Sequence, residues 1–495
     1  MCMEGNTKRK QIVFLLLFLL LASWTGVLCF YHLGEAGTHN WDEARHIVNA
    51  YEMLKSKSWW ISTYLYETDY FNYKPPLSMW CIMLSFHFFG FSSFTMRLYS
   101  AVSMMLLFIL LVSFCTKQFG RKAAIIAAIM LVSGTDLFFF HMARSADADA
   151  LYLFLLSAAM ICLYKTEKNP WFLTGVGLFL SLAFMAKCLH MAVGVAVLIC
   201  YLPRIYKKLK VKHYAVACGI AALPIGIWGI ARYLYDGITF FAGMFGQEVA
   251  HRVTIGKDYF GYLRYFFTNP VIIIAVTVIF VDLLILRRTI KNISVKDLVW
   301  KFVYSDLYLF IVWLIIPFVV YSASGAFMEW YAYTCYLPFC VIVGVVLSKA
   351  AAVDGKRGYL AKALVFMPLI GLIISCEQSL DNLKTLKYTS NTDIRADLAS
   401  LIEEHPECRG ERIYIENSRN VYQPQNVWEQ NCVADAYIQG DLMPIDGGVP
   451  LFVDDKEAIL IISKDLFESY YNTLAGRVIL VDGNDYLIFD NTFYE

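Results

Sequence analysis

The residues most able to do chemistry gather in short polar segments that border apolar stretches. In "HNWDEARHIVNAYEML", Asp42 stands at the start of a helical pattern, with Glu43 beside it and Arg45 one turn further on. A second segment, "YFNYKPPLSMW", carries Tyr73 and Lys74 before two prolines that end helical structure. A carboxylate in such a place can act on a hydroxyl, and a lysine can hold a phosphate. The plainer alternative is a helix-capping Asp42 and a Lys74 that reaches from the membrane interface into water.

Two further polar groups lie at the ends of apolar runs. The segment "HMARSADADALYLF" sets Arg144, Asp147 and Asp149 directly before one run, and Lys187 closes another, "LAFMAKCLHMAV". Charges at this depth in a membrane are costly unless they are paired or used. One of the two acids can serve as a helix cap, and Lys187 can be purely topological. An arginine with two acids nevertheless indicates more than a cap, and Lys187 favours a bound anion.

Later loops supply a third group. The segment "FGQEVAHRVTIGKDYF" brings Glu248, His251 and Arg252 close together in a helical pattern, and "FMEWYAYTCYLP" puts Trp330 and Tyr331 at the lip of an apolar run. Tryptophan and tyrosine are expected at any membrane interface, so each segment alone indicates little. In the topology given below, these residues and the ones already named lie on the same side of the membrane. The sequence therefore predicts a single pocket at one membrane face.

These residue types suit the transfer of a sugar from a lipid phosphate. Cations would hold the phosphate and take up charge as the glycosidic bond breaks, and a carboxylate would act on the acceptor hydroxyl from the opposite face, which inverts the anomeric carbon. The candidate phosphate ligands are Lys74, Arg252, Arg45 and Lys187. The candidate catalytic acids are Asp42 and Asp149. The residues expected to line the pocket are Glu43, Tyr73, Glu248, His251, Trp330 and Tyr331.

The elements that must position these residues are membrane spans. Of 495 residues, 58% are hydrophobic and 17% charged, a balance that a soluble domain does not reach. The net charge of +1 does not indicate a nucleic-acid partner. We predict a mainly α, polytopic transmembrane helical bundle with about 11 spans plus interfacial helices. The candidate spans lie near 10–31, 95–116, 121–140, 149–165, 170–187, 188–204, 212–233, 270–287, 305–323, 331–349 and 359–376.

Basic loops set the expected topology. With the N-terminus in the cytoplasm, strongly basic loops such as 204–212 and 287–296 fall on the cytoplasmic side. This solution requires the segment 76–93 to lie along the interface, and it leaves a first outside loop over 32–94. The sequence therefore predicts a multi-pass protein of the cytoplasmic membrane. Its membrane module covers 1–377, and an extracytoplasmic domain covers 378–495.

The tail is polar where the rest of the chain is apolar. Short β-type runs, "RIYIE", "AILIIS", "RVILVD" and "YLIFDN", alternate with helical patterns at 392–404 and 464–474, which predicts a small α/β domain. Most of the 13 cysteines lie in apolar runs, where they act as small hydrophobes. Only Cys408 and Cys432 lie in a polar stretch, and whether they form a disulfide stays open.

The quoted segments resemble a known enzyme family. "WDEARHIVNAYEML", "YFNYKPPLSMW" and "FFGFSSFTMRLYSAV" are similar to the opening pattern of polyprenyl-phosphate-dependent GT-C glycosyltransferases, in the branch of lipid A aminoarabinose transferases and protein O-mannosyltransferases. "ARSADADALY" resembles the family's second acidic motif, with Asp149 as the counterpart. The resemblance is close over roughly the first 190 residues. The chain departs from the family at Cys188, where glycine is expected, and at Glu329, where a lysine or arginine is frequent.

This resemblance implies a membrane glycosyltransferase that moves a single sugar from a polyprenyl (undecaprenyl) phosphate donor to a lipid, glycan or protein acceptor. It implies that Asp42 is the principal catalytic acid or base, that Lys74 and Arg252 contact the carrier phosphate, and that Lys187 lies near the donor. It also implies an aromatic lining from "EWYAYTCYLP" and, in some members, an extracytoplasmic α/β domain after the last span. Membrane lipids are the other expected partners.

Two alternatives stay open. A polytopic transporter or lipid-carrier flippase would be equally apolar, although its charges are expected near the bilayer midplane instead of at one interface. An enzyme like the oligosaccharyltransferases would need a divalent metal, for which Asp42, Asp149 and Glu248 are the candidate ligands. The sequence indicates no other cofactor and contains no Gly-rich phosphate loop.

Overall fold

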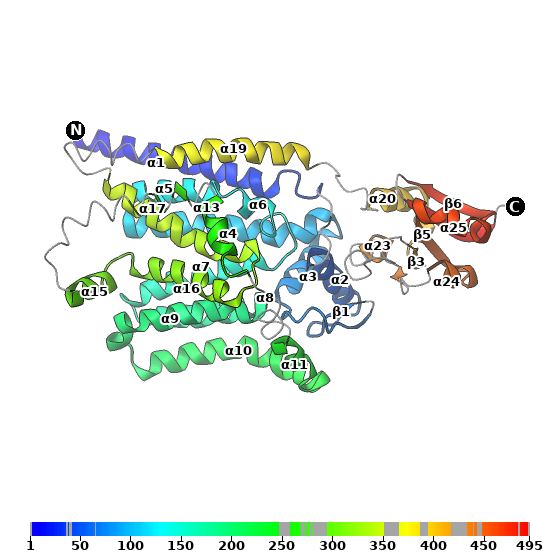
Figure 1. Cartoon of the computed structure of the whole chain (residues 1–495), viewed down its shortest axis with the longest axis horizontal. Helices are drawn as coiled ribbons and strands as arrows, with labels where there is room; N and C mark the ends of the chain where they lie inside the picture. Colours follow the sequence, from blue (N-terminus) through cyan, green and yellow to red (C-terminus); the bar gives the residue numbers. More distant parts are fainter. Residues whose placement is uncertain are drawn as a thin grey trace.

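The computed structural model consists of a bundle of long helices with a small α/β domain at one end (Figure 1). It describes residues 2–35, 38, 42–64, 66–246, 258–268, 273–274, 276–277, 280, 295–350, 366–386, 395–416, 433–438, 440–442, 448–483 and 486–493. The N-terminus lies at the end of the bundle away from the α/β domain, and the C-terminus lies at the far side of that domain (Figure 1).

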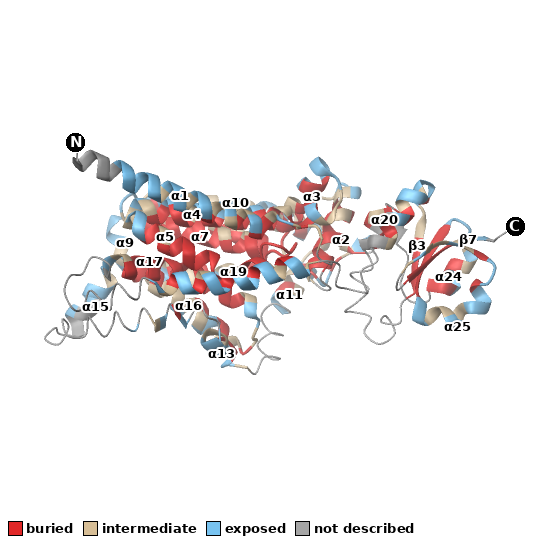
Figure 2. Ribbon diagram, turned by 90° about the horizontal axis from the view of Figure 1, so that it is seen from above, coloured by how far each residue is buried: buried red, intermediate tan, exposed pale blue. Residues whose placement is uncertain are grey.

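The bundle forms because the apolar runs of the sequence become helices that bury one another. Its helices are α1 (Cys2–Phe30), α4 (Ser93–Phe119), α5 (Arg121–Val132), α6 (Asp136–Phe139), α7 (Asp149–Thr166), α8 (Phe172–Lys187), α9 (Ala192–Ile205), α10 (Val211–Asp236), α11 (Thr239–Phe245), α13 (Gly261–Thr268), α15 (Val295–Val303), α16 (Tyr308–Ser324), α17 (Tyr336–Ala350) and α19 (Met367–Thr385). The bundle interior is almost entirely buried, whereas α1 and α19 keep exposed faces (Figure 2). Those exposed faces are apolar, which suits contact with lipid.

Six helical stretches within the described residues are long and apolar enough to cross a membrane. They are Lys8–Phe30, Ser93–Phe119, Asp149–Thr166, Phe172–Lys208, Val211–Asp236 and Glu329–Lys349. Helix α16 is a shorter apolar helix, and the predicted span near 270–287 lies mostly outside the described residues. The chain is thus a multi-pass membrane protein with the predicted, mainly α fold.

Two predicted boundaries differ from the observed helices. The span expected over 121–140 is interrupted, because α5 ends at Val132 and α6 begins only at Asp136. The Asp136 carboxylate accepts a hydrogen bond from the Tyr265 hydroxyl at 2.8 Å, which compensates an acid that is costly inside a continuous span. Helix α19 continues to Thr385, past the end of the span predicted over 359–376.

The segment between α1 and α4 folds as a cap on the bundle. It contains α2 (Asp42–Lys55), the two-stranded antiparallel pair β1 (Thr63–Tyr64) and β2 (Glu67–Thr68), and α3 (Leu77–Phe89). Helix α3 has 13 residues, which corresponds to about 20 Å and is too short for a hydrocarbon core of about 30 Å. This length agrees with the interfacial helix predicted over 76–93. The cap lies between the bundle and the α/β domain (Figure 1).

The α/β domain is built around a five-stranded mixed sheet. Its elements are α20 (Arg395–Glu404), β3 (Arg412–Glu416), α23 (Val433–Ile438), β4 (Asp441–Leu442), α24 (Gly448–Asp454), β5 (Ala458–Ser463), α25 (Lys464–Leu474), β6 (Arg477–Asp482) and β7 (Tyr486–Phe493). The strand order is β4-β3-β5-β7-β6, with β3 parallel to β4 and β5, and β7 antiparallel to both of its neighbours. The four predicted β-type runs are β3, β5, β6 and most of β7, which confirms the small α/β tail. Cys408 is a buried free thiol, and Cys432 lies outside the described residues.

Candidate active site

Helix α2 presents its first residue, Asp42, to Lys74 from the segment that precedes α3. Lys74 Nζ lies 3.4 Å from Asp42 Oδ1, and the two side chains are 14% and 32% exposed, so both remain accessible. Burial acts to raise the pKa of the Asp42 carboxyl, but Lys74 and other neighbouring positive charges outweigh burial and hold the pKa below its usual value. Asp42 is therefore an ionised carboxylate at neutral pH. The two residues meet at the end of the bundle nearest the α/β domain.

Glu43 lies behind Asp42 and fastens α2 to α4. Its buried carboxylate accepts hydrogen bonds from Arg97 Nε at 2.7 Å and Nη2 at 3.0 Å, and a further one from the Ala146 backbone N–H at 2.9 Å. A bidentate, fully buried ion pair of this kind fixes the position of α2 relative to α4. We predicted Glu43 to line the pocket. The structure instead places it inside the protein as the clamp that fixes the start of α2.

Arg45 fastens the same helix on another side. Its guanidinium donates to both carboxylate oxygens of Asp69, at 3.0 and 2.9 Å, and stacks 3.6 Å from the centre of the Tyr64 ring. The Arg45 guanidinium and other donors hold the pKa of Asp69 below its usual value despite burial. Arg45 therefore serves the fold of the cap, and this geometry gives no support to the predicted contact between Arg45 and a donor phosphate.

A second ion pair, between Lys187 and Asp149, lies deeper in the bundle. Lys187 Nζ donates to Asp149 Oδ1, and both side chains are almost fully buried. The ammonium group also lies 4.8 Å from the centre of the Tyr331 ring. Because the charge of Lys187 acts on Asp42, the two pairs belong to one electrostatic unit. The two residues line a small pocket together with Tyr152, His190, Tyr321, Trp330 and Tyr331.

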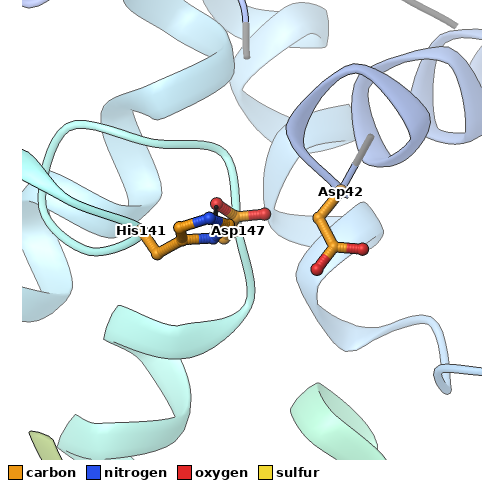
Figure 3. A group of neighbouring side chains, drawn as sticks. All are labelled: Asp42, His141 and Asp147. Atoms are coloured by element: carbon orange, nitrogen blue, oxygen red, sulfur yellow. Dashed lines mark ion pairs between the residues drawn. The ribbon is translucent and has the colours of Figure 1, made fainter. Parts of the chain in front are cut away.

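The loop before α7 adds two side chains that the sequence did not single out for the site. His141 Nδ1 lies 2.9 Å from Asp147 Oδ2, and the imidazole stacks on Trp330 with ring centres 4.0 Å apart. Burial by itself would lower the pKa of His141, but Asp147 and other acids raise it above its usual value. From the sequence, either Asp147 or Asp149 could cap the helix, and the family resemblance selected Asp149 for the site. Figure 3 shows His141 and Asp147 facing Asp42 at the start of α2.

A third residue that the sequence did not single out is His46, which lies one turn after Asp42 on α2. Its ring is buried, and its Nδ1 is 3.9 Å from Asp147 Oδ1. Burial and then the charge of Lys74 lower its pKa to about 4, so the ring is uncharged at neutral pH. The spacing of Asp42 and His46, four residues apart on a helix, was the sequence feature that could have revealed it.

The remaining predicted residues lie elsewhere. Tyr73 is buried away from the Lys187 pocket and packs on Phe240 of α11, with ring centres 5.2 Å apart. A Cβ atom on Gly243 would lie 2.3 Å from the Tyr73 hydroxyl, so the contact is tight. Glu248, His251 and Arg252 lie outside the described residues. Of the site predicted from the sequence, the structure thus brings together Asp42, Lys74, Asp149, Lys187, Trp330 and Tyr331.

Comparison with known proteins agrees with this fold. Residues 73–235 match the family model described as dolichyl-phosphate-mannose-protein mannosyltransferase. The chain is 23% identical over 346 residues to the undecaprenyl phosphate-alpha-4-amino-4-deoxy-L-arabinose arabinosyl transferase 2 of Proteus mirabilis, and 23% identical over 248 residues to an uncharacterised protein of Aquifex aeolicus. These matches cover 67% and 49% of this chain, and they span 59% and 49% of the two relatives.

Solved structures show the same fold at lower sequence identity. ArnT from Cupriavidus metallidurans, bound to undecaprenyl phosphate, superposes with a TM-score of 0.69 at 14% identity, covering 97% of this chain and 98% of that one. The archaeal oligosaccharyltransferase AglB from Archaeoglobus fulgidus, in complex with an inhibitory peptide and a dolichol-phosphate, gives 0.52 at 12% identity, covering 94% and 71%. In sequence and fold the chain thus resembles the GT-C polyprenyl-phosphate glycosyltransferases, which confirms the resemblance drawn from its motifs.

Proposed function

We propose that this protein is a membrane glycosyltransferase that moves a single sugar, with inversion, from a polyprenyl phosphate to a lipid, glycan or protein acceptor. The transfer would take place at the extracytoplasmic face, on the side of the α/β domain. The observation that carries the proposal is the contact between Asp42 and Lys74. A carboxylate and an ammonium group 3.4 Å apart, both partly exposed, offer the base and the phosphate ligand that this reaction needs. The similarity to an arabinosyl transferase and to a mannosyltransferase family supports the same reaction class.

In this reaction Asp42 accepts the proton of the acceptor hydroxyl while the hydroxyl oxygen bonds to the anomeric carbon. The bond between that carbon and the phosphate oxygen breaks, and the polyprenyl phosphate leaves with one more negative charge. Lys74 neutralises this charge as it develops. The pKa of Asp42 lies below its usual value, so the carboxylate is ionised and can accept a hydrogen bond from the incoming hydroxyl.

The other residues take supporting roles in the proposal. Lys187, held by Asp149, supplies a second positive charge to the site, and Tyr331 lies against its ammonium group. Glu43 and Arg45 are positioning residues, since their partners on α4 and in the cap fix the start of α2. A phosphate contact from Arg252 and pocket contacts from Glu248 and His251 remain predictions.

The test is transfer of label from a radiolabelled pool of membrane polyprenyl-phosphate sugars by the wild type and by Asp42→Asn and Lys74→Ala. We expect Asp42→Asn to lose about 10²- to 10⁴-fold in rate, the usual contribution of a positioned general base. Matched controls are Asp381→Asn and Lys384→Ala on α19, an exposed ion pair of similar separation, 3.3 Å. The controls should transfer label as the wild type does. Equal transfer by all five proteins would overturn the assignment of Asp42 and Lys74.

A further inference from the structure

The start of α2 and the loop before α7 bring three metal-ligand types together. One ligand atom each from Asp42, His141 and Asp147 lies within 4.8 Å of the other two (Figure 3). Ligand atoms around a tetrahedral zinc ion, at bond lengths of about 2.0–2.1 Å, lie about 3.3 Å apart. His141 Nδ1 and Asp147 Oδ2, at 2.9 Å, are already that close. Small side-chain movements would therefore complete the geometry.

His46 gives an independent indication of a ligand. It is 1% exposed, and among the described residues neither ring nitrogen makes a hydrogen bond of normal geometry. Among the described residues, Asp147 Oδ1 is likewise buried and makes no hydrogen bond, and it lies 3.9 Å from His46 Nδ1. Buried polar atoms without a partner are costly, and they are rare unless an ion or water completes them. Asp147 belongs to the cluster with Asp42 and His141, and His46 lies next to Asp147.

Neighbouring groups hold these side chains in place. Ser145 Oγ donates to Asp147 Oδ2 at 2.5 Å, and Trp330 stacks on the His141 ring at an angle of 19°. His141 itself has a φ of 56°, a conformation in which non-glycine residues cost energy and which clusters at functional sites. Such outer contacts orient metal ligands in proteins.

We propose that Asp42, His46, His141 and Asp147 form a binding site for a divalent cation of the zinc type. Two imidazoles with two carboxylates suit Zn²⁺ better than Mg²⁺ or Ca²⁺, which prefer oxygen ligands alone. The site differs from the metal ligands predicted from the sequence, because Asp149 is held by Lys187 and is not a member. Lys74 also contacts Asp42, at 3.4 Å, and would have to share that carboxylate with the cation.

The existence of this site is independent of the proposed function, whereas its use in sugar transfer rests on that function. A cation beside Asp42 would lie at the place where the donor phosphate is expected to bind. It would add positive charge to that supplied by Lys74 and Lys187.

The test measures bound metal directly. Full-length protein in detergent is stripped with EDTA, incubated with Zn²⁺ and gel-filtered, and zinc per chain is measured by mass spectrometry. Co²⁺ is used in parallel, because its visible absorption spectrum distinguishes tetrahedral from octahedral coordination. This measurement can be made on the wild-type protein and does not depend on any variant. The variants are His141→Ala, His46→Ala and Asp147→Asn. The controls are Asp381→Asn on α19 and the tail variant His405→Ala, and both of these residues lie outside the cluster.

We expect one zinc per chain in the wild type and in both controls. Each of the three ligand variants should bind zinc at least about tenfold more weakly, in line with the effect of lesser changes around metal sites. A wild type with neither bound zinc nor a tetrahedral Co²⁺ spectrum would overturn the site, as would full zinc in His141→Ala. Zinc binding without sugar transfer would refute the proposed function and leave the site standing. Transfer at the wild-type rate by a zinc-free protein would support the proposed function and overturn the use of the cation in sugar transfer.

Discussion

The buried pair of Lys187 and Asp149 illustrates how single residues in this protein depend on a partner. Their side chains are 5% and 10% exposed, and each compensates the charge of the other. Removing one member of a buried pair usually costs about 3–5 kcal/mol, because the other charge is left without a partner. Replacing both by apolar residues of similar size is often neutral.

We therefore expect Lys187→Met to lower the stability of the purified protein strongly, and the double variant Lys187→Met/Asp149→Leu to recover most of the loss. The measurement is the fraction of monodisperse protein left after heating, read by gel filtration. The double variant should still be poor in sugar transfer, since the second positive charge of the site is missing. A Lys187→Met protein as stable as the wild type would contradict this interpretation.

Cys188, next to Lys187, occupies a backbone conformation that favours glycine. Its φ is 54° and its ψ is −135°, a region that costs a non-glycine residue about 1–3 kcal/mol. This is the position at which the related family is expected to have glycine. The substitution Cys188→Gly should keep or raise thermal stability, although it removes a buried side chain.

The matched control for Cys188→Gly is Cys340→Gly. Cys340 is equally buried, but it lies inside helix α17, where glycine is unfavourable by about 1 kcal/mol. We expect the control to lose stability. If both variants lose stability to the same extent, backbone strain at Cys188 is not significant.

At the scale of helices, close packing in the bundle depends on small residues. Helix α17 approaches α5 at Gly344, where an added Cβ would lie 2.6 Å from the Ala123 carbonyl oxygen and 3.1 Å from Ala127 Cβ. Helices in membranes associate through such small residues, because lipid offers no hydrophobic driving force between them. Gly226 on α10 has no neighbour within 4 Å of an added Cβ.

Gly344→Ala is expected to lower stability by about 1–3 kcal/mol, the usual effect of overpacking a core. Gly226→Ala should leave stability unchanged or raise it, since alanine favours helix more than glycine does. Thermal unfolding of the two purified variants beside the wild type gives the comparison. If Gly344→Ala unfolds at the temperature of the wild type, the contact between α17 and α5 at Gly344 is not tightly packed.

The sequence predicted elements better than it predicted partners. The apolar runs and the β-type runs of the tail predicted most helices and four strands, because each depends on its own local pattern. The clamps of Glu43 to Arg97 and of Arg45 to Asp69 join positions 54 and 24 residues apart, and no local pattern indicates which charges will meet. His141 was missed because its position depends on a loop in an unusual backbone conformation. Asp42 and Lys74 were expected together, since both border the interface in one outside loop.

At the scale of the whole molecule, the α/β domain docks on the cap that carries Asp42. Tyr437 of α23 packs on Phe91, with ring centres 4.8 Å apart, and its hydroxyl hydrogen-bonds Ser93 at 2.9 Å. Lys55 at the end of α2 donates to the Gly440 carbonyl oxygen at 3.0 Å. One apolar cluster contains residues of α2, α3 and the sheet, so the two parts share a core.

Tyr437→Ala should loosen this contact and speed amide hydrogen exchange in α2, whereas Tyr437→Phe, which keeps the ring, should have a much smaller effect. Sugar transfer should fall with the alanine variant, because α2 positions Asp42. The measurement is hydrogen exchange of peptides from 42–55, read by mass spectrometry. Exchange in α2 that is the same for the wild type and the alanine variant would show that docking does not stabilise this helix.

The central claim is that Asp42 drives release of polyprenyl phosphate from a lipid-linked sugar. The most direct measurement follows ³²P-labelled polyprenyl-phosphate sugars in proteoliposomes that contain the wild type or Asp42→Asn, with a membrane extract as acceptor source. We predict that the wild type converts the labelled donor into free polyprenyl phosphate and that Asp42→Asn does so at least about 100-fold more slowly. Intact donor that crosses the bilayer equally well with both proteins, without release of polyprenyl phosphate, would contradict the account and identify a transporter.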